Sequence, residues 1–441
     1  MSLATPESVR KIRATLHAKA KGAPSFRFYS LYDKVCRRDA LEHAYARCRK
    51  NAGAPGIDGQ TFDAIEAQEL SGWLDALAQD LRERTYRPGA IRRVFIPKPD
   101  GSQRPLGIGN VRDRVAQMAA VIILEAIFEA DLPPEQYAYR PGRDAHAALR
   151  RVHELMHTGY TQVVDADLSG YFDSIPHPEL LKSVARRVSD GRILALIKAW
   201  LQAPVEERTR RGNVSRTTRN RDERQGTPQG SPLSPLLANI YLRRFVLGWK
   251  QLGYDKRLDA QIVNYADDFV ICCRRDAESA LAAMQSIMAR LKLTVNTSKT
   301  HVCRVPADSF DFLGYTIGTC YKPRSGVRYI GTRPAAKRIA RIKREISRLT
   351  ESRRTLVPVE KQVAQLNWLL TGWSNYFCLG AVTPSYRALD YHARERLRRW
   401  LCRKHGVDSR GSLRFPDQHL YDELGLVKLC LRTKGFSWAK A

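Results

Sequence analysis

The 441-residue chain has no apolar run long enough to cross a membrane. A spanning helix needs about 20 apolar residues, whereas the longest run, residues 118–128, is interrupted by Glu125. The amino terminus also lacks the apolar core of a secretory signal, and residues 9–23 are instead basic and weakly amphipathic. An organellar transit peptide stays open as an alternative, but the sequence predicts no membrane partner.

Cysteine is present without the spacing that metal sites or disulfide frameworks use. None of the nine cysteines forms a C-x-x-C pair, and structural zinc sites are usually built from such pairs. Disulfides persist mainly in oxidising compartments. We therefore expect free thiols in a reducing compartment, with Cys272 and Cys273 packed in the core.

Acidic residues are scarce relative to basic ones. The chain has 74 Lys and Arg against 45 Asp and Glu, a net charge of +29. Residues 321–441 alone hold 26 basic and 9 acidic side chains. Such an excess favours a polyanion such as nucleic acid as the partner. An arginine-dense segment, 206–225, suits RNA phosphates, although a solvated surface hairpin would have the same composition.

One glycine-rich loop is not a nucleotide-binding P-loop. Residues 53–59 read G-A-P-G-I-D-G and lack the G-K-[ST] ending whose lysine and hydroxyl bind phosphate and Mg²⁺. The P-loop use is therefore rejected, and a length of 441 residues is enough for two or three domains.

Two short stretches of the sequence bring aspartates close together. Asp267 and Asp268 lie between short apolar runs in N-Y-A-D-D-F-V-I-C-C, which predicts a tight hairpin with the acids at its tip. Adjacent carboxylates repel each other unless a cation binds, and Mg²⁺ prefers oxygen ligands. A solvated turn is the alternative for this pair alone.

A second acidic stretch strengthens the metal interpretation. Residues 162–177 read Q-V-V-D-A-D-L-S-G-Y-F-D-S-I-P-H, and a strand there would place Asp165 and Asp167 on one face. Asp173 lies past the bend, and we expect it to hydrogen-bond locally. Two strands that offer carboxylates to shared ions form the two-metal clamp of phosphoryl transfer.

Three motifs in this order resemble the palm of reverse transcriptases, most closely those encoded by group II introns. They are D-L-S-G-Y-F-D at 167–173, T-P-Q-G-S-P-L-S-P-L-L-A-N at 227–239 and Y-A-D-D at 265–268. The resemblance implies an α+β right-hand polymerase, with fingers and a palm built on antiparallel sheet and then a helical thumb or maturase domain. It implies an RNA-directed DNA polymerase that extends a primer 3′-hydroxyl with two Mg²⁺ ions and assists intron splicing and mobility.

The resemblance also implies a division of the chain. We expect a basic RNA-binding extension at 1–54, fingers and palm at 55–320, a thumb at 321–390 and a DNA-binding region at 391–441. Relatives often continue into an endonuclease with Cys and His ligands, and the spacing for such a site is missing here. We therefore expect no DNA-cleaving activity of the chain itself.

Specific residues take their expected roles from the same resemblance. Three aspartates are catalytic, and the metal ligands are Asp167, the Leu168 carbonyl, Asp267 and Asp268, with Asp165 less central. Residues 91–109 predict a hairpin around the Pro99-Asp100-Gly101 turn, whose arms carry triphosphate-binding cations. The substrate-binding set is Lys98, Arg104, Tyr171, Gln229, Gly230 and Lys299.

Some of these residues have more than one expected role. Tyr171 would lie under the sugar and exclude a 2′-hydroxyl. Lys299 would act as a general acid on pyrophosphate or as a charge only. Arg140 and Arg143 would contact phosphate or be structural. The aromatic residues of the thumb, which include Trp368 and Trp373, are expected in its core rather than on a base-stacking surface.

The expected partners are an RNA template, intron RNA, a DNA primer or target, and deoxynucleotides, in a bacterial cytoplasm near the nucleoid. Three other functions fit part of the pattern. One is a maturase in which polymerisation is vestigial, and another is a domesticated enzyme of phage defence or DNA repair. The third is a retron or diversity-generating enzyme, which the basic thumb disfavours.

Overall fold

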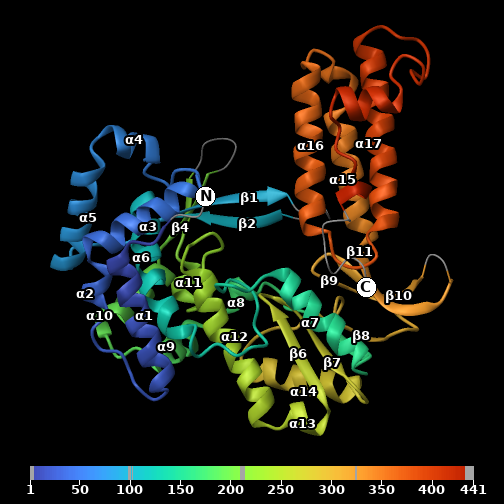
Figure 1. The fold of residues 1–441 in the computed structure, drawn as a ribbon. Helices are drawn as coiled ribbons and strands as arrows, with labels where there is room; N and C mark the ends of the chain where they lie inside the picture. The colour runs from blue at the N-terminus through green and yellow to red at the C-terminus, as the bar shows by residue number, and fades with distance from the viewer. Residues whose placement is uncertain (1–3, 98–100, 102, 209–213, 323–324, 433–441) are drawn as a thin grey trace. The chain divides into compact units, whose positions relative to one another are not determined.

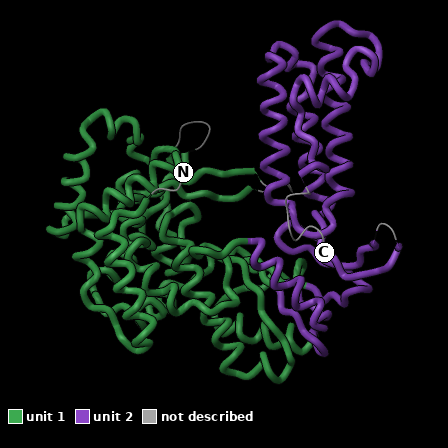
Figure 2. The backbone as a smooth tube through the Cα atoms, viewed as in Figure 1, with its two compact units in different colours: residues 1–144, 166–269, 278–300 green, residues 145–165, 270–277, 301–441 purple. Residues whose placement is uncertain are grey.

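The computed structural model describes residues 4–97, 101, 103–208, 214–322 and 325–432. It divides into two compact units (Figure 2). Unit 1 comprises residues 1–144, 166–269 and 278–300, and unit 2 comprises 145–165, 270–277 and 301–441. Neither unit is one continuous segment, because the chain passes from one to the other repeatedly. The four-part division expected from the sequence stays a prediction.

Unit 1 is built around the helix α6 (Val111–Phe128), most of whose side chains are buried. The helices α1 and α3 pack on it, and Arg13 of α1 forms an ion pair with Glu125 of α6 at 2.6 Å. The helices of unit 1 are α1 (Glu7–Gly22), α2 (Tyr32–Val35), α3 (Arg38–Lys50), α4 (Phe62–Ala67), α5 (Leu70–Glu83), α6, α8 (Tyr171–Ser174), α9 (His177–Ala185), α10 (Gly191–Leu201), α11 (Arg219–Asp222), α12 (Ser234–Gln251), α13 (Tyr254–Arg257) and α14 (Ala277–Arg290), whose first residue belongs to unit 2.

A four-stranded sheet of unit 1 has the order β2-β1-β4-β5 (Figure 1). Its strands are β1 (Ile91–Pro97), β2 (Gln103–Ile108), β4 (Val205–Arg208) and β5 (Val214–Thr217). β1 and β2 form the antiparallel hairpin predicted for residues 91–109, in which Ile96 pairs with Arg104. β4 and β5 form a second hairpin within the arginine-dense segment, and β4 pairs with β1 in parallel.

A second sheet has the order β6-β7-β3-β8, and the division between the units runs through β3 and β7. Its strands are β3 (Gln162–Asp167), β6 (Ala260–Tyr265), β7 (Asp268–Cys273) and β8 (His301–Arg304). The apolar runs beside the acidic turn are buried, because Val263 and Phe269 are 0% exposed. This burial holds the end of β6 and the start of β7 in the core, so the residues between them form the turn.

Unit 2 holds a three-stranded sheet and a helical bundle. The sheet has the order β11-β10-β9, with β9 (Phe310–Phe312), β10 (Tyr315–Tyr321) and β11 (Arg328–Pro334) antiparallel. The helices are α7 (Ala145–His157), α15 (Ala336–Leu349), α16 (Val359–Tyr376), α17 (Thr383–Lys404) and α18 (Leu429–Arg432), with a 3₁₀ turn at Ser352–Arg354 and a π turn at His419–Glu423. The α+β class expected from the sequence is confirmed.

The bundle has an apolar interior and a basic exterior. Ile342 and Ile346 of α15 are buried with Leu366 of α16 and Trp400 of α17. Lysines and arginines occupy the other faces of α15, so the amphipathic helix predicted there is present. One expectation for the bundle is wrong, because Trp368 is 82% exposed and is not a core residue. Its α16 position lies off the apolar stripe that contains Val363, Leu366 and Leu370.

All nine cysteines are free thiols, and eight of them are buried. Cys272 and Cys273 are 0% exposed on β7, as expected for core packing. Among the helices of the described residues, none combines the length and the apolar character that crossing a membrane requires.

Candidate active site

Asp267 and Asp268 lie at the tip of the β6–β7 hairpin. β6 ends at Tyr265 and β7 begins at Asp268, so only two residues connect the strands. The first of them, Ala266, has φ +59, a left-handed conformation that tight two-residue hairpin turns require. Both carboxylates are half-buried. The hairpin predicted from the sequence is therefore present with its acids at the turn.

Asp167 is the last residue of β3, where it is enclosed by the loop that follows α14. The backbone N–H of Asn296 donates to the Asp167 carbonyl at 2.9 Å. Two side chains of the same loop reach its carboxylate: Lys299 Nζ lies 3.0 Å and Asn296 Nδ2 lies 3.2 Å from Oδ2. Leu168 follows in a backbone bridge with Val295. The loop thus holds this carboxylate in one orientation.

Three charged side chains from distant parts of unit 1 converge on Asp267. Burial raises the pKa of the Asp267 carboxyl, and the negative charge of Asp167 raises it further. Arg104 and Lys299 act in the opposite direction. Because such effects fall off with distance, the structure has brought Asp167, Arg104 and Lys299 close to this carboxylate.

The chemistry of these donors fits a divalent cation. Carboxylate oxygens are hard ligands, and a bound cation relieves the repulsion between two neighbouring carboxylates. Within the described ranges, no group of three or more His, Cys, Asp or Glu side chains stands at metal-holding distance. Lys299 supplies the positive charge on Asp167 in this arrangement. Asp167 and Asp267 are thus a suitable pair of ligands, without a complete ligand set.

Asp165 has different surroundings from Asp167. It lies two residues earlier on β3, in unit 2, where His301 Nε2 is 3.8 Å from its carboxylate. Asp165 shares the strand face of Asp167 but not its loop contacts.

The remaining residues of the predicted set are placed as follows. Lys98 lies outside the described residues. Arg104 is exposed on β2. The ring of Tyr171 is buried, and its hydroxyl donates to the Ala238 carbonyl of α12 at 2.6 Å. Gln229 and Gly230 lie in the loop that precedes α12.

That loop is in close contact with strand β2. The Gly107 N–H donates to the Gln229 carbonyl at 2.6 Å. Gly230 has φ +109, and a Cβ there would lie 2.7 Å from the Gly107 carbonyl oxygen. Only glycine allows this approach without displacing the strand. Arg104 stands three residues before Gly107, so the contact also fixes the strand that carries Arg104.

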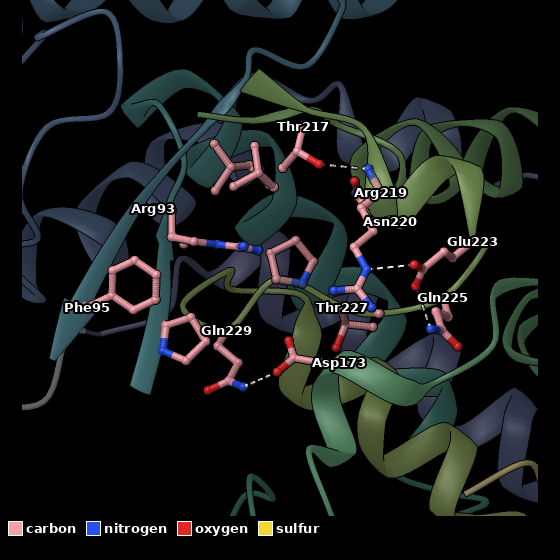
Figure 3. A pocket seen from close by; sticks show the side chains of 16 residues that line it. Arg93, Phe95, Asp173, Thr217, Arg219, Asn220, Glu223, Gln225, Thr227 and Gln229 are labelled. Carbon is pink, nitrogen blue, oxygen red and sulfur yellow. Dashed lines mark hydrogen bonds and ion pairs between the residues drawn. The ribbon is translucent and has the colours of Figure 1, made fainter. Parts of the chain in front are cut away.

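A cavity of about 350 Å³ opens beside this contact (Figure 3). Its walls come from β1, β2, β4, α11 and the loop at 225–229. Gln229 Nε2 donates to Asp173 Oδ2 at 3.1 Å, as Figure 3 shows. The local hydrogen bond expected for Asp173 is therefore wrong, because this partner lies 56 residues further along the chain. Arg93 faces the same carboxylate and lowers its pKa against the raising effect of burial.

Arg140 is structural. It is buried, and its guanidinium is bonded to the Glu129 carboxylate and to three backbone carbonyls. Arg143 donates to the Pro134 carbonyl at 2.7 Å and lies over the ring of Tyr137. Both arginines stabilise the segment between α6 and α7, and neither directs its donors toward Asp267.

Tyr139 is a site residue that sequence reasoning missed. The segment before it is fixed to β6 and to α12: Tyr137 N–H donates to the Asn264 carbonyl of β6 at 2.9 Å, and Asn239 of α12 donates to the Ala138 carbonyl at 2.7 Å. Tyr139 itself has φ +57 and is 51% exposed. Partial burial and the charge of Asp267 raise the pKa of its phenol, while Arg104 lowers it. An exposed aromatic ring in a strained conformation thus stands beside the carboxylates.

Comparisons with known proteins identify the family of the chain. The family "Reverse transcriptase (RNA-dependent DNA polymerase)" matches residues 96–317, and "Group II intron, maturase-specific domain" matches residues 339–414. One solved chain, in "Partial Cas6-RT-Cas1--Cas2 complex", is 23% identical with a TM-score of 0.33 over 59% of this chain and 41% of its own, which is too low to support an argument.

Curated relatives are more similar. "Protein YkfC" of Escherichia coli is 31% identical over 75% of this chain and 93% of its own length. "Group II intron-encoded protein LtrA" of Lactococcus lactis is 34% identical over 53% of this chain and 38% of its own length. The chain thus matches nearly all of the first relative and about two-fifths of the second. It belongs to the reverse transcriptases, the RNA-dependent DNA polymerases, and within them to the group II intron-encoded reverse transcriptase/maturases.

Proposed function

We propose that the chain copies an RNA template by adding deoxynucleotides to a primer 3′-hydroxyl, with divalent cations held by Asp167, Asp267 and Asp268. One observation supports this most strongly. The carboxylates of Asp167, at the end of β3, and of Asp267, in the β6–β7 turn, lie close to two cations, Arg104 of β2 and Lys299 of the loop after α14. This is the combination that phosphoryl transfer uses, with oxygen ligands for cations beside positive charges for phosphate.

Each residue has a separate task in this proposal. Asp167 and Asp267 orient the cations by fixed carboxylates, and Asp268 adds a third oxygen donor from the start of β7. When bound, Mg²⁺ supplies the Lewis acid that lowers the pKa of the primer hydroxyl and neutralises the leaving pyrophosphate. Arg104 holds the triphosphate from β2. Lys98 lies outside the described residues, so its role stays an expectation from the sequence.

Lys299 has two successive partners in the proposal. Without substrate its ammonium is bonded to Asp167, which partly neutralises the repulsion between the carboxylates. When a cation binds Asp167, the ammonium is released to contact triphosphate oxygens. From there it acts by charge or by donating a proton to pyrophosphate.

Primer extension tests the proposal directly. Asp267→Asn keeps the shape of the side chain and removes its charge, so we expect extension on an RNA template to fall by at least about 100-fold. Asp165→Asn is the matched control, because it makes the same change two residues from Asp167 and lies outside the converging set. Extension by Asp267→Asn at the wild-type rate would overturn the proposal.

A second activity, support of intron splicing, is favoured by the maturase-specific match at residues 339–414. This range covers most of α15, all of α16 and α17, and the turns after them. The outward lysines and arginines of α15 offer charge to RNA phosphates without reading bases. We propose that intron RNA binds this basic exterior of the bundle.

A further inference from the structure

Unit 1 contains a second cavity, of about 590 Å³, that none of the residues of the proposed active site lines. Its walls come from α9 and the residues that follow it, from the middle of α12, and from residues 24–25 and 128–131. We call it the basic pocket, because five of the side chains that line it are cations. They are Lys182, Arg186, Arg187, Arg243 and Arg244.

Two carboxylates in the lining do not balance these cations. Glu179 already accepts an ion pair from Lys292 at 2.6 Å, and Lys292 is not part of the lining. Asp131 is the other carboxylate, and it faces Arg186, Arg187 and Arg243 together. The positive charge of the pocket therefore exceeds what its own acids can neutralise.

The arginines also repel one another. Burial lowers the pKa of the Arg243 guanidinium, and the charges of Arg186 and Arg187 lower it further against the opposing effect of Asp131. Like charges held this close in a partly buried site are costly, and an anion between them removes the cost. Nothing else in the pocket offers that anion.

Hydrogen bonds hold Arg187 in the wall of the pocket, whereas the cations at its opening form no salt bridge with a described residue. Arg187 is 3% exposed and donates to the carbonyls of Ala20, Ala23 and Pro24. Its Nε lies 3.3 Å from Asp131 but has no hydrogen-bond partner. Lys182 and Arg186 at the opening are exposed and form no salt bridge with any described residue. Their donors are available to a ligand.

We infer that the basic pocket binds phosphate groups. Guanidinium forks match phosphate oxygens in pairs, and a lysine at the opening adds a point charge. The volume exceeds that of one phosphate and has room for a nucleotide unit. The phosphate can come from a nucleic-acid strand that passes over the pocket or from a free anion such as pyrophosphate. The pocket shares no residue with the proposed catalytic set.

Protection of Lys182 from acylation tests the pocket on the full-length chain. The protein is treated with an acylating reagent alone, with single-stranded oligouridylate and with pyrophosphate, and modification is measured by mass spectrometry. Lys198 is the internal reference, because it is exposed on α10 and does not line the pocket. We expect a ligand to slow modification of Lys182 and leave Lys198 unchanged.

The variant R186Q/R244Q removes two charges from the pocket, and R192Q/R257Q removes two from exposed positions elsewhere in unit 1. We expect half-protection of Lys182 to need a roughly tenfold higher ligand concentration in the first variant and an unchanged one in the second. Protection by RNA alone identifies a nucleic-acid strand as the source, and protection by both or by pyrophosphate alone identifies a free phosphate as a ligand. If neither slows the modification of Lys182, or if R192Q/R257Q weakens protection as much as R186Q/R244Q, the inference is overturned.

Discussion

Two tyrosines near Asp267 are held in opposite ways. Tyr171 is 2% exposed, and its hydroxyl is bonded to the backbone of α12. Tyr139 is 51% exposed, in a backbone conformation that tyrosine seldom adopts. Packing therefore explains the conformation of Tyr171, whereas we expect the exposed ring of Tyr139 to contact a molecule that enters the site.

Sugar discrimination is the expected property of Tyr171. Tyr171→Ala removes the ring that would crowd a 2′-hydroxyl, so we expect the ratio of ribonucleotide to deoxynucleotide incorporation to rise at least about tenfold. Tyr171→Phe keeps the ring and should keep the discrimination. Primer extension with each nucleotide type measures the ratio. An unchanged ratio in a folded Tyr171→Ala protein would remove this role.

Nucleotide affinity is the expected property of Tyr139. Stacking of a ring against a nucleotide is worth about 1–3 kcal/mol, so Tyr139→Ala should raise the KM for deoxynucleotides by roughly fivefold or more. Thermal stability should hold or improve, because alanine lessens the crowding of the left-handed backbone only slightly and loses no buried contact. Tyr139→Phe should behave as wild type. A lowered melting temperature with an unchanged KM would indicate a purely structural tyrosine.

At the scale of elements, the loop before α12 and strand β2 act together. Gly230→Ala adds a Cβ that meets the Gly107 carbonyl and also strains a φ of +109. We expect a loss of about 1–3 kcal/mol in the free energy of unfolding, measured by urea denaturation. We also expect a higher KM for deoxynucleotides, because β2 carries Arg104.

Gly253→Ala separates the effect of backbone strain from the effect of the contact with β2. Gly253 also has a positive φ, of +71, but a Cβ there meets nothing within 4 Å. It should therefore show the backbone strain alone, with KM unchanged. Equal effects of the two substitutions on KM would mean that the contact with β2 does not position Arg104.

Local patterns predicted the elements that depend on neighbouring residues. The two hairpins, the strand that ends at Asp167 and the amphipathic α15 follow from alternation, turn residues and helical spacing. The patterns failed where the partner is distant in sequence. Asp173 bonds Gln229 rather than a neighbour, and Tyr139 reaches the site only because Asn239 and Asn264 anchor the segment before it.

Trp368 shows a different limit of the sequence. Its aromatic character favoured the core, yet its position on α16 points away from the apolar stripe of that helix. Residue type predicted a buried Trp368 and helical position predicted an exposed one, and the exposed position is the one observed. The resemblance to known polymerase motifs located Arg104, Gln229 and Lys299, which composition and spacing would not have selected.

For the whole molecule, the two activities are expected to separate. In the proposed function polymerisation depends on the carboxylates of unit 1, whereas the maturase-specific match falls on the helices of unit 2. Asp267→Asn should therefore abolish cDNA synthesis while intron RNA binding and splicing stay within about twofold of wild type. Splicing assays with the parent intron RNA measure this. Parallel loss of both activities would show that splicing also requires the intact polymerase centre.

The hidden thiols have a practical consequence. Burial raises the pKa of Cys36 to about 11 and that of Cys48 to about 12, so at neutral pH both stay in the unreactive protonated form. These two thiols should therefore react slowly with iodoacetamide and oxygen in the folded chain and quickly in an unfolded one. The alkylation rate measured at each cysteine would then report which region of the molecule opens first and how often it opens.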